Sequence, residues 1–496
     1  MVVATDLRAT MCSKVRGSGW GVLGCLWFGL AADAVAAPPQ AAAEQPDSPG
    51  LAALGLPAAR KVTLGGALAY ARAHQSAVVA ALARIREEKA NAEVPRAQYY
   101  PLVGVMAQFL EGTANNTTAS YLTTPFVDLP RIGGTSFNAS SATASWKPSA
   151  STLAGAGARQ EIFDFGRIAA EAAAADARIV VAAHASDTER LDIELAVEEA
   201  FFAVHAAKSI LQSSEDAYQR SLVHRDFAQA GVRSGLRAPI DLTRAEADLS
   251  RFDTGRIRAR GGVAASQAVL AAAVGSTDLA LDAADEPPSA LDLPALSNAL
   301  ALASNKDPRL QLAIARLRGQ ELETRAVGAL LRPDVHLSAA ISGRAGGAPS
   351  NGIGAEEASG SGYLPNVPNW DAALVLSWPL FDPTINARQR ASRAAEEVQR
   401  AEIDLVKQQL VSSVERAYVE VAVAREALPS LRHELEAARA NYAQGEARFK
   451  AGLGTSVELA DAEALRVDAE IRLALGVFDL AKARAAFGRT IAAGLQ

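Results

Sequence analysis

The sequence predicts a mainly α-helical fold with inserted β-strands, in which one structural unit occurs twice. Three observations lead to this prediction. Of the 496 residues, 49% are hydrophobic but only 5% are aromatic, and alanine supplies much of the difference, as is typical of helices. Two helical runs, Arg167–Arg233 and Asn386–Lys450, each span roughly 100 Å if continuous, at ~1.5 Å per residue. Short motifs recur at a constant shift of 217 positions, as Gly235-Leu236 and Gly452-Leu453 show.

The amino terminus has the order of an export signal. Basic residues precede an apolar stretch at 20–32 and small residues follow it, so residues 1–36 are predicted to be a signal peptide cleaved after Ala36. Met11 is an alternative start, since it leaves a signal of ordinary length. The sequence Val22-Leu23-Gly24-Cys25 weakly matches a lipoprotein cleavage site and leaves lipidation as an alternative. Beyond this region, no segment has the run of about 18 apolar residues that a transmembrane helix needs.

Each copy of the repeated unit has the same internal order. A helical segment of about 30 residues ends at a proline, and a β-like region, a very long helical run, a glycine-marked turn and a final helix follow. Because this order occurs twice, we expect both copies to fold alike. The expected boundaries are a linker at 37–61, a first repeat at 62–276 with a strand pair at about 101–163, a linker at 277–290, a second repeat at 291–488 with a strand pair at about 333–381, and a tail at 489–496.

The long helical runs predict a bundle or coiled coil. Helices of globular proteins seldom exceed about 20 residues, so these runs need neighbouring helices along their length. Pro429 is expected to kink or interrupt the second run about two-thirds of the way along. Apolar residues at steps of three and four mark one face of that run: Ile403, Val406, Leu410, Val414, Ala417 and Val421.

Strand signals lie between the helical segments. Apolar residues alternate from Trp370 to Phe381, and Leu102–Leu110 and Val335–Ile341 are weaker strands. Trp370 and Trp378 fall on one face of the first of these, roughly 26 Å apart at ~3.3 Å per residue. At a tilt of ~40° this spacing gives a band of about 20 Å, close to the apolar belt between the aromatic girdles of an outer-membrane barrel. A sandwich strand with one buried face explains the alternation equally well and would bury both tryptophans.

Four motifs, in this order and twice over, resemble the TolC-like outer membrane efflux proteins. The resemblance covers nearly the whole mature chain, from about Val62 to Gly488. It implies a homotrimer in which each protomer gives four strands to a shared twelve-stranded outer-membrane β-barrel and its long antiparallel helices to a periplasmic α-barrel. The motifs are Val62–Leu68 at the entry, Tyr99-Tyr100-Pro101 before the first strand, Ile162–Arg167 before the long helix, and Ala451-Gly452-Leu453 with Glu458-Leu459 at the turn.

The resemblance also implies a function in conduction rather than catalysis. The chain would be the exit duct of a tripartite efflux or type I secretion system, working with an inner-membrane pump and a periplasmic adaptor to export drugs, metals or proteins. Four strands with two open edges are not viable in lipid, where every backbone polar group must be paired, and closure between protomers solves this problem. A soluble exported helical scaffold or adaptor, with ordinary hairpins and no channel, is the alternative.

Signals for other chemistry are missing from the sequence. The six histidines are scattered without the spacing of metal ligands, and no phosphate-binding loop or nucleophile elbow occurs. Both cysteines, Cys12 and Cys25, lie within the predicted signal peptide. The formal charge of −6 implies no surface for nucleic acid. We therefore expect no enzyme, no cofactor and no metal centre.

The turns after the long runs match the periplasmic entrance of the family. Asp241 in the first copy and Glu458 and Asp461 in the second match acidic entrance positions, and threefold symmetry would make each a ring of three carboxylates that attracts cations. Helix capping is the competing interpretation. Thr455-Ser456-Val457-Glu458 reads as a capping box, and Pro239 followed by Asp241 suits a first helical turn. Asp461 lies beyond the first turn and is the better gate candidate.

Both turns also present residues that the resemblance assigns to adaptor contact. These are Gly235 and Leu236 in the first copy and Gly452, Leu453 and Gly454 in the second. The glycines permit helix-ending conformations and leave a leucine at each tip. A leucine that packs back onto its own helices is an equally good interpretation.

One departure from the family concerns the lock of the closed state. Some relatives bond the first-copy aspartate to a tyrosine and an arginine near the second turn, but the matching residues are Phe449 and Gly454. Neither can offer Asp241 a side-chain hydrogen bond. The sequence therefore predicts a weaker or differently built lock, unless another cation replaces these partners. The candidates are Arg237, Arg448 and Lys450.

Overall fold

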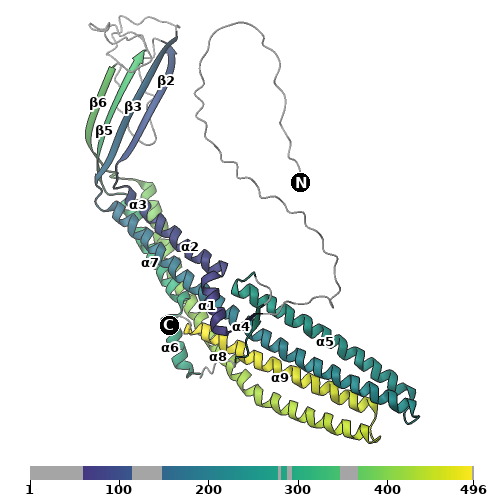
Figure 1. Cartoon of the computed structure of the whole chain (residues 1–496). Helices are drawn as coiled ribbons and strands as arrows, with labels where there is room; N and C mark the ends of the chain where they lie inside the picture. The colour runs from purple at the N-terminus through teal and green to yellow at the C-terminus, as the bar shows by residue number, and fades with distance from the viewer. Residues whose placement is uncertain (1–59, 114–147, 278–280, 287–292, 347–366, 494–496) are drawn as a thin grey trace, which may run out of the picture. The chain divides into compact units, whose positions relative to one another are not determined.

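A computed structural model describes most of the chain (Figure 1). The predicted signal peptide at 1–36 lies outside the described residues, as does the linker at 37–61 except for its last two residues. The described ranges contain no helix with both the length and the hydropathy needed to cross a membrane. These ranges are 60–113, 148–277, 281–286, 293–346 and 367–493.

The same order of elements occurs in both copies, and the mainly α fold with two pairs of long strands is confirmed. The first copy contains β1 (Arg60–Val62), α1 (Leu64–His74), α2 (Ser76–Asn91), α3 (Glu93–Ala97), β2 (Leu102–Thr113), β3 (Pro148–Phe163), α4 (Arg167–Arg233) and α5 (Pro239–Val274). The second contains β4 (Leu281–Ala283), α6 (Leu296–Lys306), α7 (Pro308–Ala329), β5 (Asp334–Gly346), β6 (Val367–Ser377), α8 (Pro383–Lys450) and α9 (Ser456–Thr490).

The helices differ from the prediction at two points. The segments that open each copy are divided rather than continuous, and the second is divided at Asp307, whose buried carboxylate accepts the backbone N–H of Arg309 (2.8 Å) and caps α7. Pro429 was predicted to kink or interrupt the second long run, and the interruption is wrong because α8 runs through Pro429, while the kink stays a prediction. Leu428 and Leu435 are buried on either side of Pro429. Packing of this face therefore holds the helix where one backbone hydrogen bond is lost.

Two sheets join the copies. The long strands form one antiparallel sheet in the order β2-β3-β5-β6, so its centre pairs a strand of the first copy with one of the second. Among the described residues, β2 and β6 each pair on one side only, which leaves two open edges. The short strands β1 and β4 pair in parallel. The predicted linker at 277–290 thus contains a strand, which its composition did not indicate.

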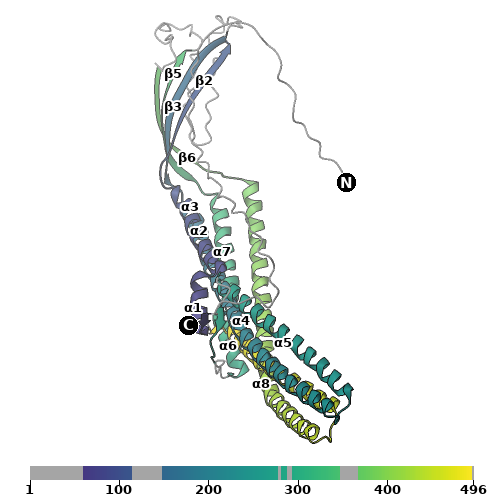
Figure 2. The same ribbon diagram turned by 45° about the vertical axis from the view of Figure 1, so that its right-hand side comes forward.

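The long helices pack side by side in a curved layer (Figures 1 and 2). Nearer the strands the contacts run α2–α4–α7–α8, and nearer the turns they run α5–α4–α9–α8. Two large buried clusters, one around Phe201 on α4 and one around Phe487 on α9, and a smaller one around Phe449 near the end of α8 hold this layer together. The helices α2, α5 and α8 lie at the margins of the layer, and each has a long face that no described helix covers.

Candidate functional site

The antiparallel sheet has one apolar and one polar face. The register places Val105, Ala156, Ile341 and Trp370 in one row across the four strands. Of these, Val105 is 81% exposed, Ile341 60% and Trp370 80%, although each lies in a paired strand. An apolar face this exposed has the composition of a surface in contact with lipid rather than with water.

The opposite face of the sheet is polar. One row on that face contains Leu102, Arg159, Ser338 and Ala373, and His336 lies two positions before Ser338. The buried His336 ring lies 3.2 Å from the Asp334 carboxylate and 3.3 Å from the Arg159 guanidinium. Apolar and polar residues therefore alternate along the strands, as they do in a barrel that separates lipid from a polar lumen.

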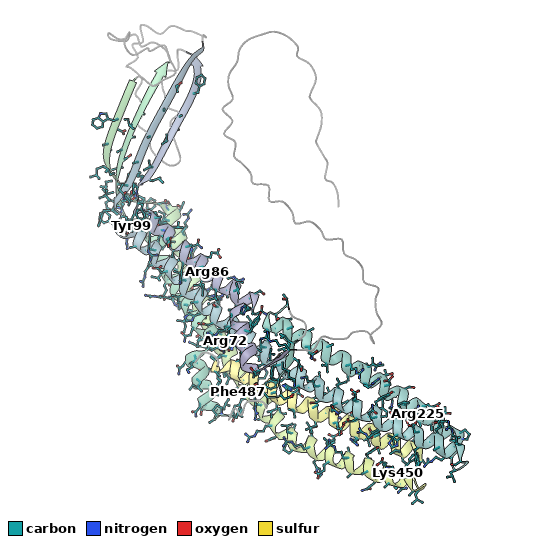
Figure 3. All side chains as sticks on the ribbon, viewed as in Figure 1. Arg72, Arg86, Tyr99, Arg225, Lys450 and Phe487 are labelled. Atoms are coloured by element: carbon teal, nitrogen blue, oxygen red, sulfur yellow. The ribbon has the colours of Figure 1, made fainter. Side chains whose placement is uncertain are left out.

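Exposed aromatic and aliphatic side chains gather where strands and helices meet, near Tyr99 (Figure 3). Trp378 is 57% exposed, so neither tryptophan is buried as the sandwich interpretation required. The indole N–H of Trp378 donates to the carbonyl oxygen of Leu331 (3.2 Å). Other exposed members of this group are Tyr100, Ile162, Phe163, Phe165, Leu380 and Phe381. The sequence prediction found only the tryptophans, although Tyr100 lies in the motif before the first strand and Ile162, Phe163 and Phe165 lie in the motif before the first long helix.

An aspartate caps the long helix that follows each strand pair. Asp164 accepts the backbone N–H of Gly166 (3.0 Å) and of Ile168 in the first turn of α4, and Asp382 accepts that of Thr384 (2.7 Å) in α8. Phe165 has a φ of +50°, a conformation that few side chains adopt, and its ring stacks edge-on against Phe163 (4.6 Å). The repeated Phe-Asp motif thus caps a helix and leaves aromatic rings exposed.

The two helix turns lie side by side at the other end of the long helices, near Arg225 and Lys450 (Figure 3). We call residues 233–241 the first tip and residues 450–461 the second tip. Gly235 and Gly452 have φ values of +72° and +71°, so both end a helix in the left-handed conformation. Leu236 and Leu453 are 84% and 75% exposed, and neither packs back onto its own helices.

The predicted entrance acids have different surroundings. Glu458 is exposed, and its backbone N–H donates to the Thr455 hydroxyl (3.2 Å), as the capping interpretation predicts. Asp461 is also exposed and forms no ion pair with a described residue. Asp241 is half-buried and accepts a hydrogen bond from the Ser456 hydroxyl (3.0 Å). Asp241 therefore has a partner in the second tip, but a neutral one that the sequence prediction did not consider.

Arg237 connects the first tip to the end of α8, next to the second tip. Its guanidinium lies 3.8 Å from the centre of the Phe449 ring and 5.3 Å from that of Phe227. Its Nη2 donates to the carbonyl oxygen of Phe449 (2.8 Å). None of the candidate cations contacts Asp241: Arg448 donates to the carbonyl oxygen of Leu453, and Lys450 pairs with Glu446. The first tip is thus joined to the end of α8 through Phe449, which stands where the sequence resemblance led us to expect a tyrosine.

A buried polar cluster lies next to the tips, between α4, α8 and α9. His224 bonds to the Tyr442 hydroxyl (2.9 Å), and Arg220 pairs with Glu463 (2.8 Å), which is only 2% exposed. Burial lowers the pKa of His224, raises that of Glu463, and raises the pKa of Tyr442 to about 12. These shifts favour neutral forms of His224 and Tyr442, while Arg220 opposes the effect of burial on the Glu463 carboxyl.

No metal-binding cluster of histidine, cysteine or acidic side chains occurs in the described part of the chain. Three surfaces distinguish the described part of the chain: an apolar sheet face, an aromatic zone at the strand–helix junction, and two tips that lie side by side.

Comparisons with known proteins identify a matching family and a group of solved structures with a similar fold. A family model described as outer membrane efflux protein matches residues 67–276 and 299–489. Protein CyaE of Bordetella pertussis is 32% identical over 241 residues, which is 47% of this chain and 46% of that protein, so the match spans about half of the relative.

Solved outer-membrane channels have a similar fold. The outer-membrane channel OprN has a TM-score of 0.64 at 20% identity, with 86% of this chain and 89% of that chain covered. The Campylobacter jejuni CmeC outer membrane channel has a TM-score of 0.68 at 12% identity, with 87% and 86% covered. At these identities the likeness concerns the fold alone.

Proposed function

Because the chain belongs to the outer membrane efflux protein family, we propose that it is the exit duct of a tripartite efflux or type I secretion system. Members of this family are efflux proteins rather than enzymes, and the chain is an outer-membrane protein that extends into the periplasm. The soluble exported scaffold, the alternative from the sequence, does not agree with this membership. The proposed partners are two further copies of the chain, a periplasmic adaptor and an inner-membrane pump.

The apolar face of the open-edged sheet carries this proposal. In lipid, the unpaired backbone groups of β2 and β6 each cost several kcal/mol, so the sheet needs a partner at both edges. The edges differ, because β2 belongs to the first copy of the repeat and β6 to the second. A heterologous contact of this kind closes into a ring when the rotation fits. Three copies would give twelve strands, with Trp370 and Trp378 at the membrane girdles.

The helical layer supports the same closure. Its margins are α2 and α5 on one side and α8 on the other, so first-copy elements again lie opposite second-copy elements. A single rotation would therefore join sheet edges and helix margins together. The result is a barrel in the outer membrane that continues into a helical tunnel in the periplasm.

The tips are proposed as the periplasmic entrance. Asp241, Glu458 and Asp461 would each form a ring of three carboxylates, and Asp461 is the member with neither a cap nor a partner in the described structure. The exposed leucines Leu236 and Leu453, held out by their flanking glycines, are the proposed contacts to the adaptor.

Membrane fractionation combined with unheated and heated gels tests the proposed function. We expect the protein in the outer-membrane fraction and an oligomer band that heating converts to the monomer. A periplasmic monomer that never associates with membrane would contradict the proposal.

A second experiment tests the proposed role of Asp241. Asp241→Ala removes the acceptor of the Ser456 hydroxyl, so the tips are held less firmly and the channel conductance in planar bilayers rises. A hydrogen bond from a hydroxyl to a carboxylate contributes roughly 1.5 kcal/mol at such a half-buried position, so the closed–open equilibrium shifts about ten-fold. Ser456→Ala removes the same bond from the other side and serves as the matched variant. If the wild type and Asp241→Ala had equal conductance, the proposed role of Asp241 in gating would be contradicted.

A further inference from the structure

The outer face of α8 carries a second apolar stripe. Ile403, Leu410, Val414 and Val421 are buried against the neighbouring helices. Val398 precedes Ile403 by five positions, which places it about 140° round the helix at ~100° per residue. Val398, Leu405 and Val419 repeat at multiples of seven, and all are more than half exposed (55%, 52% and 57%). A stripe of this length, turned away from the protomer's own helices, predicts a partner helix.

The margin across from α8 carries its own exposed apolar residues at matching heights along the helices. Leu82 on α2 is 48% exposed and Val269 on α5 is 58% exposed. At ~1.5 Å per residue, Leu82 lies about 22 Å from the end of α3, and Val398 lies about 22 Å from the start of α8. By the same measure Val269 lies about 45 Å from the start of α5 near the first tip, and Val419 lies about 46 Å from the end of α8 near the second tip.

Closer to the tips the same margins carry charges instead. Arg256 contacts α4 through Glu215 (3.8 Å), and Arg258 lies two positions on, about 200° round the helix, so it faces outward. On α8, Glu426 lies two positions before the buried Leu428, which is also about 200° round the helix, so Glu426 faces outward as well. Arg258 and Glu426 are both exposed, and neither has an ion-pair partner among the described residues. Their heights above the helix ends at the tips differ by about 7 Å, at ~1.5 Å per residue, which two long side chains span.

We infer that α8 of one protomer docks against α2 and α5 of a second copy along a seam that is apolar above and ionic near the tips. The pairs are Val398 with Leu82, Val419 with Val269, and Glu426 with Arg258. A rotation about an axis along the helices keeps each residue at its height, so the matching heights are what such a seam requires. This inference rests on the proposed ring of three copies, and it names the residues that neighbouring copies use to contact each other.

Crosslinking tests the apolar part of the seam in the full-length, membrane-inserted protein. The native cysteines are Cys12 and Cys25, and both are replaced by alanine. With Val269→Cys and Val419→Cys on one chain, a short bismaleimide is expected to give covalent dimers and trimers on a denaturing gel. The control variant carries Val269→Cys and Arg425→Cys. Arg425 is exposed but lies about 120° round α8 from Val419, so this variant should give only monomers on the denaturing gel. Equal crosslinking in both, or none in a protein that still shows the oligomer band, would overturn the seam.

Charge reversal tests the ionic part. Arg258→Glu places like charges at the seam, and we expect the oligomer band to dissociate at a lower temperature than in the wild type. Arg258→Glu combined with Glu426→Arg restores the pair and should return this temperature to the wild-type value. A combined variant no more stable than Arg258→Glu would refute the pairing. A wild-type chain without any oligomer band would instead contradict the proposed function, so the two failures are distinguishable.

Discussion

Replacing Ala372 by arginine is expected to abolish assembly in the outer membrane. Ala372 pairs with Ala339 on the apolar face of the sheet, next to the row of Val105 and Trp370. An arginine facing lipid near the middle of a barrel strand costs about 2–4 kcal/mol in each copy, and a ring of three copies would carry that cost three times. We expect little or no heat-sensitive oligomer in outer-membrane fractions and export-defective cells.

Ala373→Arg is the matched control for this prediction. It is the same substitution one residue further along β6, but the register places it on the polar face beside Ser338. Long polar side chains are tolerated in a lumen, so assembly should persist while conductance and ion selectivity change. If both variants assembled equally well, the apolar face would not be the lipid-facing surface.

Replacing Arg237 by alanine is expected to open the tips. The substitution removes the guanidinium from Phe449 and Phe227 and deletes the hydrogen bond to the Phe449 carbonyl oxygen. A cation–π contact together with a hydrogen bond from a charged donor contributes roughly 2 kcal/mol, which shifts a closed–open equilibrium about thirty-fold. We expect a large rise in open probability in planar bilayers and increased sensitivity of cells to bulky antibiotics.

Arg233→Ala controls for the loss of a positive charge at the same tip. Arg233 is exposed in the last turn of α4 and has no ion-pair partner among the described residues, so its removal should leave gating unchanged. Arg237→Lys keeps the charge but not the planar group that stacks on the ring, and we expect an intermediate phenotype. Wild-type gating in Arg237→Ala would show that the tips are held together elsewhere.

Local sequence patterns were sufficient to predict the long helices and the long strands. The 3.6-residue periodicity of α8 and the alternation in β6 depend on neighbours along the chain, so the sequence reports them directly. The end of α4 at Arg233 and the end of α8 at Lys450 were correct because glycines mark both turns and Pro239 marks the start of α5. By contrast, β1 and β4 are three residues each and form only by pairing with each other, so no local pattern indicated them.

The contacts of the tips could not be predicted from the sequence. Proximity of Arg237 to Phe449 and of Ser456 to Asp241 arises from two hairpins that meet in space, more than 200 positions apart. The sequence did show that the expected tyrosine and arginine are missing, which is a local fact. Which residue takes their place depends on side-chain geometry. The aromatic zone is a similar case, because Tyr100, Phe163 and Phe165 lie in motifs that the sequence shows, but their shared exposure follows only once the strands are paired.

The pairing of β3 with β5 has a consequence for the order of folding. Glu161 pairs with His336, 175 positions further on, and Arg489 of the last helix bonds to Asp192 of the first long helix (2.6 Å). A chain exported amino terminus first therefore cannot complete its first repeat until the second has emerged. During this interval the apolar stripes and sheet edges are open to wrong partners. We expect the nascent protein to depend on periplasmic holding chaperones, and a chain that stops before α9 to be degraded rather than folded.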